Sequence, residues 1–327
     1  MTPLPSGVLE HIVDSHCHPT DAPSISAASM QQLQITVCAM STHSKDQSLV
    51  RELAQTYPSK IIPCFGHHPW FSHFITTNAG VAKHEHYHRL FQPTEELYPA
   101  FEDLLPHLPE PVLLDDILVD LRSNFASCSS PPMLGEVGID AIFKVPYDYH
   151  ATPRRISPFM IPLEHQLTVL EAQIDIAVEF GASVSFHSVK CPQATLELFD
   201  RLKRKHEENW NNIRFDIHSC SMSPETLVQL QRKHANVWMS VSTTINGRSR
   251  NLRPLIAACA VDKLLIESDY DAIEQSTPKC LEILDIVAEV KGWHIETDWD
   301  DGDENGAVHR LEANWKVFSA TQTRTTE

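Results

Sequence analysis

Two histidines, His16 and His18, follow the apolar pair Ile12-Val13 in the segment Asp-Ser-His-Cys-His near the start of the chain. Side chains alternate across a β-strand, so residues two apart point to the same side and can hold one cation together. Four further residues of ligand types that divalent metals prefer end other short apolar runs: Glu136, His187, His218 and Asp269. Together these residues predict a metal site assembled from several strand ends.

Eight short runs rich in β-branched and aliphatic residues predict the strands that must position these groups. The runs begin near residues 12, 35, 61, 133, 184, 213, 237 and 264. Apolar residues spaced by three and four predict helices between them, at 47–57, 163–180, 195–206, 224–234 and 280–290. Strands that alternate with helices indicate a parallel sheet, and eight repeats favour a closed (β/α)8 barrel over an open, doubly wound α/β sheet. We expect one such domain over residues 1–327.

The barrel interpretation makes a statement about where the polar residues lie. In (β/α)8 barrels the functional residues gather at the C-terminal ends of the strands. His16 and His18 close the first run and Glu136 the fourth, while His187, His218 and Asp269 close the fifth, sixth and eighth. We therefore expect all six candidate ligands to face one mouth of the barrel.

Structural explanations exist for single members of this set. A lone buried histidine, such as His187 taken alone, is usually a hydrogen-bonded core residue, and Glu136 could be the ion-pair partner of Lys144. However, packing explains poorly why an acidic residue stands between Gly135 and Gly138 at a strand end. The metal interpretation is preferred because the residues occur together.

Composition and charge narrow the class of protein. The formal net charge is −17, which argues against a broad basic face that follows a nucleic-acid backbone. It does not exclude a nuclease, because two divalent cations would place positive charge where a phosphate binds. No basic leader and no apolar stretch of about 20 residues is evident, so we expect no membrane partner and a cytoplasmic or nuclear location. The eight cysteines are scattered without a Cys-x-x-Cys pair, so disulfides are not expected.

Two segments are longer than a barrel connection needs, and we expect insertions at about 71–130 and 140–162. The first contains His84, His86 and His88, which could form an extra metal site, although an exposed loop would impose no geometry on them. The second contains Arg154 and Arg155, which could clamp a phosphate through bidentate hydrogen bonds or serve as surface charges.

The motifs, taken in order, resemble the TatD family of metal-dependent deoxyribonucleases over nearly the whole chain. The matching segments are 14–18, 66–69, 135–140, His187, 216–219, 265–269 and 314–318. The resemblance implies a TIM barrel, a pair of divalent metals and hydrolysis of phosphodiesters, often by removal of nucleotides in the 3′-to-5′ direction. Mg, Mn, Co or Zn would suit the mixed histidine and carboxylate set.

The resemblance also implies roles for individual residues. His16, His18 and Asp269 would bind the first metal and His187 and His218 the second, while Glu136 would bridge the two metals. The chemistry of a two-metal site predicts in addition that Asp269 orients or deprotonates a water molecule and that His68 contacts the phosphate. Asp14 is expected to hold an imidazole or a strand end in place.

Other positions depart from the family pattern. Trp70 replaces a common second histidine after the Gly-His-His-Pro segment; beside His68, it could stack on a base or pack at the rim. His187 is followed by Ser188-Val189-Lys190, whereas the family usually has an arginine, suited to contact a phosphate, two residues after this histidine. At the sixth strand Cys220 and Met222 replace Phe and Gly, and Tyr270-Asp271 replaces Ala-Pro after Asp269. The expected metal ligands are all present, whereas the rim around them has changed.

Our leading hypothesis is therefore a binuclear phosphoesterase of the TatD type that acts on DNA or RNA ends. The altered rim and the acidic charge leave open a phosphatase or a diesterase for a small phosphoester on the same metals. Amide hydrolysis is the weakest enzyme hypothesis, because related barrels often bridge their metals with a carboxylated lysine where this chain has Glu136. A different class of function, a scaffold that binds a protein partner through the inserted segments, also stays open.

Overall fold

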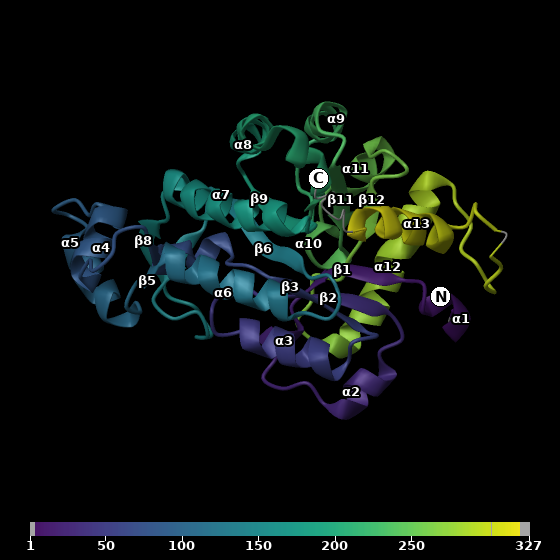
Figure 1. Ribbon diagram of the computed structural model, residues 1–327, viewed down its shortest axis with the longest axis horizontal. Helices are drawn as coiled ribbons and strands as arrows, with labels where there is room; N and C mark the ends of the chain where they lie inside the picture. Colours follow the sequence, from purple (N-terminus) through teal and green to yellow (C-terminus); the bar gives the residue numbers. More distant parts are fainter. Residues whose placement is uncertain (1–3, 302, 321–327) are drawn as a thin grey trace, which may run out of the picture.

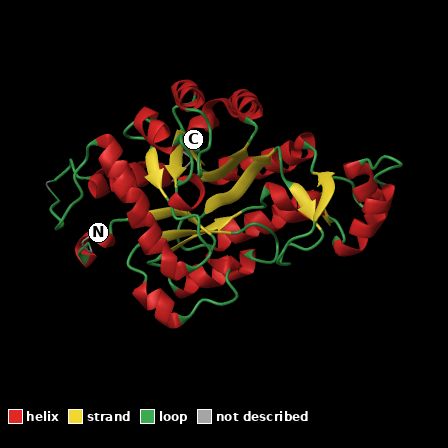
Figure 2. Ribbon diagram, turned by 180° about the vertical axis from the view of Figure 1, so that it is seen from behind, coloured by secondary structure: helices red, strands yellow, loops and turns green. Residues whose placement is uncertain are grey.

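Eight parallel strands form the central sheet of the computed structural model, which describes residues 4–301 and 303–320. Their spatial order is β1 (Val13–Cys17), β2 (Thr36–Met40), β3 (Ile61–Phe65), β6 (Met133–Asp140), β9 (Val184–Val189), β10 (Phe215–Ile217), β11 (Val237–Val241) and β12 (Leu264–Ile266). Every neighbouring pair in this order is parallel. Figure 2 shows the strands in the interior with helices around them.

Backbone hydrogen bonds join the last strand to the first at the carboxyl end of the sheet. The N–H of Asp269 donates to the carbonyl of His16 over 2.9 Å, and the N–H of His18 donates to the carbonyl of Tyr270 over 2.9 Å. The sheet is therefore a nearly closed barrel, as the eight apolar runs predicted. Since both faces of such strands are covered, their side chains are almost all buried.

Helices cover the outside of the barrel (Figure 1). The larger ones are α3 (Gln47–Thr56), α6 (Leu114–Ser127), α7 (Leu163–Phe180), α8 (Pro192–His206), α9 (Pro224–Lys233), α11 (Leu252–Ala258), α12 (Ile273–Lys291) and α13 (Ala307–Ser319). Shorter helices are α1 (Ser6–Leu9), α2 (Ala27–Gln32) and α10 (Thr243–Asn246). The five predicted helices are present. Helix α12 begins at Ile273, before the predicted residue 280, although it contains Pro278, a residue type that usually marks a helix boundary.

The two inserted segments pack against each other beside the barrel. The first contains the 3₁₀ helix η2 (Pro69–Phe74), β4 (Ile75–Thr76), α4 (Lys83–Phe91), α5 (Tyr98–Leu104), η3 (Leu105–His107) and β5 (Val112–Leu113). The second contributes the antiparallel pair β7 (Lys144–Pro146) and β8 (Ile156–Met160). We call residues 69–113 and 143–162 the side lobe; its helices α4 and α5 lie at the left edge of Figure 1.

A separate apolar cluster holds the side lobe together. Tyr87, Phe101, Leu104 and Leu108 from the first segment pack with Val145, Tyr147, Phe159 and Ile161 from the second. Helix α6, although it lies inside the predicted insertion at 71–130, packs against α7 and β3 as a helix of the barrel. The first insertion therefore ends at Leu113 in this structure. The expectation of a single domain over the whole chain stays a prediction.

One glycine shows how closely the strands of the site approach each other. Strands β6 and β9 pair Gly138 with His187. A Cβ atom on Gly138 would lie 2.0 Å from the carbonyl oxygen of His187, a distance that no side chain tolerates. Gly138 thus allows β6 to carry Glu136 into the immediate neighbourhood of the histidine on β9.

Within the described ranges, 4–301 and 303–320, no helix is long and apolar enough to cross a membrane.

Candidate metal centre

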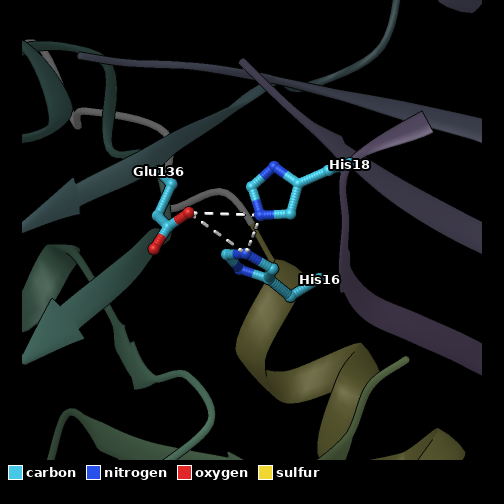
Figure 3. Close-up of side chains that lie close together, drawn as sticks. All are labelled: His16, His18 and Glu136. Carbon is cyan, nitrogen blue, oxygen red and sulfur yellow. Dashed lines mark hydrogen bonds and ion pairs between the residues drawn. The ribbon is translucent and has the colours of Figure 1, made fainter. Parts of the chain in front are cut away.

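Glu136, on β6, lies at the centre of the six predicted ligands, and its two carboxylate oxygens face different groups of side chains. Oε2 lies 3.2 Å from His18 Nε2 and 3.4 Å from His16 Nε2, and Figure 3 shows both imidazoles turned toward it. Oε1 lies 2.7 Å from His187 Nδ1 and 2.7 Å from His218 Nε2. Glu136 is 3% exposed, so water competes little for these contacts.

The first group of donor atoms has the spacing of a metal site. His16 Nε2 and His18 Nε2 are 3.0 Å apart, and Asp269 Oδ1 lies 3.5 Å from His18 Nε2 and 3.8 Å from His16 Nε2. Four ligands at about 2.0–2.1 Å from a tetrahedral cation are separated from one another by roughly 3.4 Å. The nitrogens of His16 and His18, with one oxygen each of Glu136 and Asp269, fit that requirement.

A second group surrounds the other oxygen of Glu136. His187 Nδ1 and His218 Nε2 are 3.1 Å apart, and both contact Glu136 Oε1. His68 Nε2 also lies 3.0 Å from this oxygen and 3.3 Å from His187 Nδ1. The structure thus brings all six predicted ligands together, with Glu136 between two groups and His68 beside the second.

Contacts of the remote ring nitrogens determine which lone pairs are available. His16 Nδ1 lies 2.7 Å from Ser185 Oγ, and His187 Nε2 lies 3.6 Å from Asp140 Oδ2. A proton on each of these remote nitrogens leaves the other nitrogen of the ring free to bind a cation. His68 differs, because its Nδ1 accepts a hydrogen bond from the N–H of Trp70 over 3.1 Å. Its Nε2 therefore carries the proton in the neutral ring, which makes His68 a donor toward the cavity.

Asp140 was missed as a site residue, although it ends the Gly135–Asp140 motif. Its Oδ1 accepts hydrogen bonds from the N–H of Ile142 over 2.8 Å and from the N–H of Phe143 over 3.0 Å. Its Oδ2 accepts a hydrogen bond from Trp70 Nε1 over 2.8 Å. These bonds fix the carboxylate that faces His187. Burial alone would raise the pKa of Asp140, but the bonds from His187, Trp70 and Ile142 lower it to about 2.

Asp140→Asn is expected to weaken metal binding without unfolding the barrel, because it removes the charge that orients His187 but keeps the side-chain shape. Loss of such a supporting partner costs about 10–100-fold in metal affinity. Titration of metal-free protein with Zn²⁺ or Mn²⁺, followed by calorimetry, measures the change. Asp120→Asn, on the exposed face of α6, is the matched control. Equal affinity in Asp140→Asn and the wild-type protein would contradict the role given to Asp140.

Asp14 holds the strand ends rather than an imidazole ring. Its Oδ1 accepts the N–H of Ser268 over 2.8 Å and that of His16 over 3.2 Å. Desolvation by burial raises the pKa of Asp14 to about 7. The carboxyl group therefore ties β1 to the segment that carries Asp269.

Backbone strain accompanies Asp269. Its φ of 47° is rare for a residue other than glycine, and Ser219, at 39°, shares this conformation. Ser219 Oγ donates to Asp269 Oδ2 over 3.0 Å, and the N–H of Ser219 donates to Glu267 over 2.7 Å. The strained ends of β10 and β12 thus support each other at the mouth of the barrel.

Burial and the mutual contacts of carboxylates and imidazoles set the protonation states of the centre. Burial alone would raise the pKa of Glu136, but the imidazoles of His68, His218 and His16 hold it well below its usual range, and neighbouring histidines likewise lower the pKa of Asp269. Burial lowers the pKa of His16 to about 3 and that of His68 to about 4. Burial alone would also lower the pKa of His187 and His18, but the contacts of His187 with Asp140 and Glu136 raise its pKa to about 9, and those of His18 with Asp269 and Glu136 raise its pKa well above the usual value. Near pH 7 the centre therefore combines charged carboxylates with neutral rings at His16 and His68, whereas His18 and His187 hold protons that a bound cation would displace.

The other predicted site residues lie at different distances from this centre. Trp70 borders it, since its ring meets the ring of His68 edge-on at a centroid distance of 4.9 Å. Arg154 lines the cavity above the centre. Arg155 instead pairs with Asp103 and lies 3.8 Å over the ring of Tyr147 inside the side lobe, so the structure does not bring it to the site.

The histidines of the first insertion do not converge. They lie on helix α4, not in a loop, and His86 is buried with its Nε2 2.8 Å from the carbonyl of His73. His84 and His88 stack at 5.8 Å on an exposed face, because residues four apart share one side of a helix whereas residues two apart do not. Among the described residues these three do not form a metal-binding group.

Comparison with known families agrees with this geometry. The family described as TatD related DNase matches residues 13–300.

The chain belongs to the TatD family.

It is accordingly a metal-dependent hydrolase that acts on ester bonds, and its histidine and carboxylate groups could hold the metal. TatD-related proteins match it over nearly their full length. It is 31% identical to Cut9-interacting protein scn1 of Schizosaccharomyces pombe and 26% identical to the uncharacterized deoxyribonuclease YMR262W of Saccharomyces cerevisiae, with 95% of this chain and 99% of each relative covered. The crystal structure of YJJV, a TatD homologue from Escherichia coli, shares the fold with a TM-score of 0.60 and 18% identity, covering 95% of this chain and 98% of that one.

Proposed function

We propose that this TatD-family chain is a binuclear phosphodiesterase that removes nucleotides from DNA or RNA ends in the 3′-to-5′ direction. One observation carries the binuclear part: the two oxygens of Glu136 face two separate groups of ligand atoms. A carboxylate in this position can bridge two cations a few ångströms apart, which is the arrangement used for in-line displacement at phosphorus. His16, His18 and Asp269 would hold one cation, and His187 and His218 the other.

Two cations at this place would neutralise a phosphate and make water more acidic. Side chains of the protein supply the proton acceptor and the hydrogen-bond donor that the reaction also needs. Asp269 faces the first group through Oδ1, so it can accept a proton from a water molecule held there. His68 presents an N–H that can donate to a nonbridging phosphate oxygen as charge develops on it.

The donor set suits Mn²⁺, Co²⁺ and Zn²⁺ through its imidazoles and Mg²⁺ through its carboxylates. The metal is therefore best identified by reconstitution. The predicted cytoplasmic or nuclear location stays a prediction.

Hydrolysis of a 5′-labelled single-stranded DNA oligonucleotide tests the proposal. Purified protein is stripped with a chelator, reloaded with one of the four metals and incubated with the substrate, and the products are separated by length. A ladder that shortens from the 3′ end, lost on chelation, supports it. Absence of cleavage with all four metals, or products from internal cuts alone, would contradict the exonuclease assignment; cleavage of a small aryl phosphate alone would favour the phosphatase alternative.

His68→Gln separates a phosphate contact from a metal ligand. Since the Nε2 of His68 carries a proton, we expect the metal content to stay at the wild-type value while kcat/KM falls by about 100-fold, the usual cost of one donor to a developing charge. Metal analysis and steady-state kinetics on the same sample give both values. Loss of one metal per chain would instead assign His68 to the second group of ligands. His84→Gln, on the exposed face of α4 and outside the cavity lining, is the control.

A second candidate function is protein binding by the side lobe. Four of its large apolar side chains are exposed, namely Tyr98, Val112, Ile156 and Met160. The Schizosaccharomyces pombe relative is named as interacting with Cut9, so a protein partner is a reasonable candidate for this chain too. Ile156→Lys combined with Met160→Lys should abolish capture of such a partner while hydrolysis is preserved; unchanged capture would exclude β8 as the docking strand.

A further inference from the structure

A cavity of about 1230 Å³ joins the metal centre to the side lobe. Glu136, His18, His187 and Asp269 form its floor, and one wall consists of lobe residues around His107, Pro109 and Tyr147. Its volume is somewhat larger than that of a typical small-molecule site, so the phosphate at the metals occupies only part of it. The remaining space must accommodate the organic part of the substrate.

Aromatic rings form a continuous wall from the metal centre into this space. Trp70 stacks on Phe143 at a centroid distance of 4.7 Å, and Phe143 faces Tyr149 at 6.1 Å. Tyr149 in turn contacts Phe71 at 4.8 Å, and Phe71 contacts Phe74 at 5.8 Å. Four of these five rings line the cavity; Phe143 supports Trp70 from behind. Such a surface suits a flat, uncharged ring such as a nucleobase.

The charges along the same cavity have the opposite sign from those of a nucleic-acid track. Outside the proposed ligands its lining contains two permanent cations, Lys45 and Arg154. Its carboxylates are Asp21, Asp46, Glu110, Asp140, Asp148 and Asp271. Proteins that bind single strands without sequence preference combine stacking rings with a positively charged groove that follows the backbone. This cavity has the rings but not the positive groove, and because charges act on one another over a Debye length of about 8 Å, the excess of carboxylates repels each further phosphate.

From these observations we infer that the cavity selects very short substrates. The preferred class is a phosphodiester that carries one or two phosphates and a base, such as a dinucleotide or trinucleotide, with the base against Phe71 and Tyr149. A long strand is disfavoured because its additional phosphates meet the acidic lining. This inference rests on the proposed phosphodiesterase function and adds the substrate class to it.

The length of the oligonucleotide substrate is the variable that tests the inference. The value of kcat/KM is measured for the thymidine oligomers dT2, dT3 and dT20 with the metal-loaded protein at 50 and 200 mM salt. We expect dT2 or dT3 to exceed dT20 by about tenfold at low salt, and the gap to narrow at high salt because salt screens repulsion. A kcat/KM that rises with length and falls steeply with salt indicates a basic track and overturns the inference.

Equilibrium binding separates failure of this inference from failure of the proposed function. Fluorescently labelled dT2 and dT20 are titrated with metal-loaded protein. If neither is hydrolysed but dT2 binds more tightly, the proposed function fails and the selectivity stands. Tighter binding of dT20, or no binding of either oligomer, overturns the selectivity as well.

Two sets of variants assign the effect to the cavity. Phe71→Leu should raise KM for dT2 about fivefold with kcat unchanged, because stacking needs the aromatic ring. Phe71→Tyr keeps the ring and should have the wild-type KM. Tyr98→Leu, an exposed lobe aromatic outside the cavity, is the matched control. Glu110→Lys with Asp148→Lys should raise kcat/KM for dT20 more than for dT2; equal effects on both lengths would count against charge as the cause.

Discussion

Replacing Glu136 with glutamine is expected to abolish hydrolysis and to lower the metal content below the proposed two ions per chain. Both carboxylate oxygens are in use: Oε2 faces the nitrogens of His16 and His18, and Oε1 faces His187 and His218. Glutamine keeps one oxygen, but its NH₂ group presents protons to the other set and cannot bind a cation. The loss should exceed the roughly 100-fold that removal of a supporting partner costs at a metal site.

Metal analysis by mass spectrometry together with oligonucleotide hydrolysis gives the two required measurements. Glu197→Gln, on an exposed face of α8, provides a control with the same chemical change outside the site. A Glu136→Gln protein that keeps two ions and cleaves at the wild-type rate would show that Glu136 is not a bridge. A folded variant with one ion and no cleavage is the expected result.

The strand ends of the barrel could be predicted because apolar runs and ligand types coincide in the sequence. The run that ends in Ile217 places His218 at the mouth, just as the run that ends in Ile266 places Asp269 just beyond it. Eight such runs fix the order of strands in a parallel barrel, so the meeting of six residues far apart in sequence followed from topology alone. Neither the spacing of donor atoms nor the division of Glu136 between two groups follows from topology.

Other features depend on contacts that no local pattern contains. The side lobe forms because an apolar surface on residues 83–108 meets another on residues 145–161, and each half looked like a separate insertion. The partnership of Asp140 with His187 arises from the pairing of β6 with β9. The positive φ of Asp269 is imposed by surrounding hydrogen bonds, against the preference of an aspartate backbone. These features depend on tertiary contacts and therefore could not be predicted from local sequence patterns.

The sequence also could not distinguish the roles of the adjacent residues Arg154 and Arg155. Adjacent in sequence and identical in chemistry, they were equal candidates for a phosphate contact. In the structure Arg154 faces the cavity, whereas Arg155 turns toward Asp103 and Tyr147 because alternate residues near β8 point to opposite sides. Only the position of β8 against α5 distinguishes them.

Asp269→Asn is expected to eliminate hydrolysis while the barrel remains folded. Asparagine can keep the contact of this side chain with Ser219, since the hydroxyl group of Ser219 can accept from an amide as well as donate to a carboxylate. What it loses is the negative charge beside His16 and His18 and the ability to accept a proton. We therefore expect weaker binding at the first group and a drop in kcat/KM of more than about 100-fold.

The melting temperature of the metal-free protein distinguishes this expectation from simple unfolding. Burial alone would raise the pKa of Asp269, but neighbouring histidines stabilise its charge and lower that pKa, so its removal should lower the metal-free melting temperature modestly without unfolding the protein. The stabilisation gained on adding metal should shrink as well. Asp262→Asn, exposed beyond the opposite end of β12, should change neither value. If Asp269→Asn cleaved DNA at the wild-type rate, the chemistry would have to depend on a different carboxylate, such as Glu136.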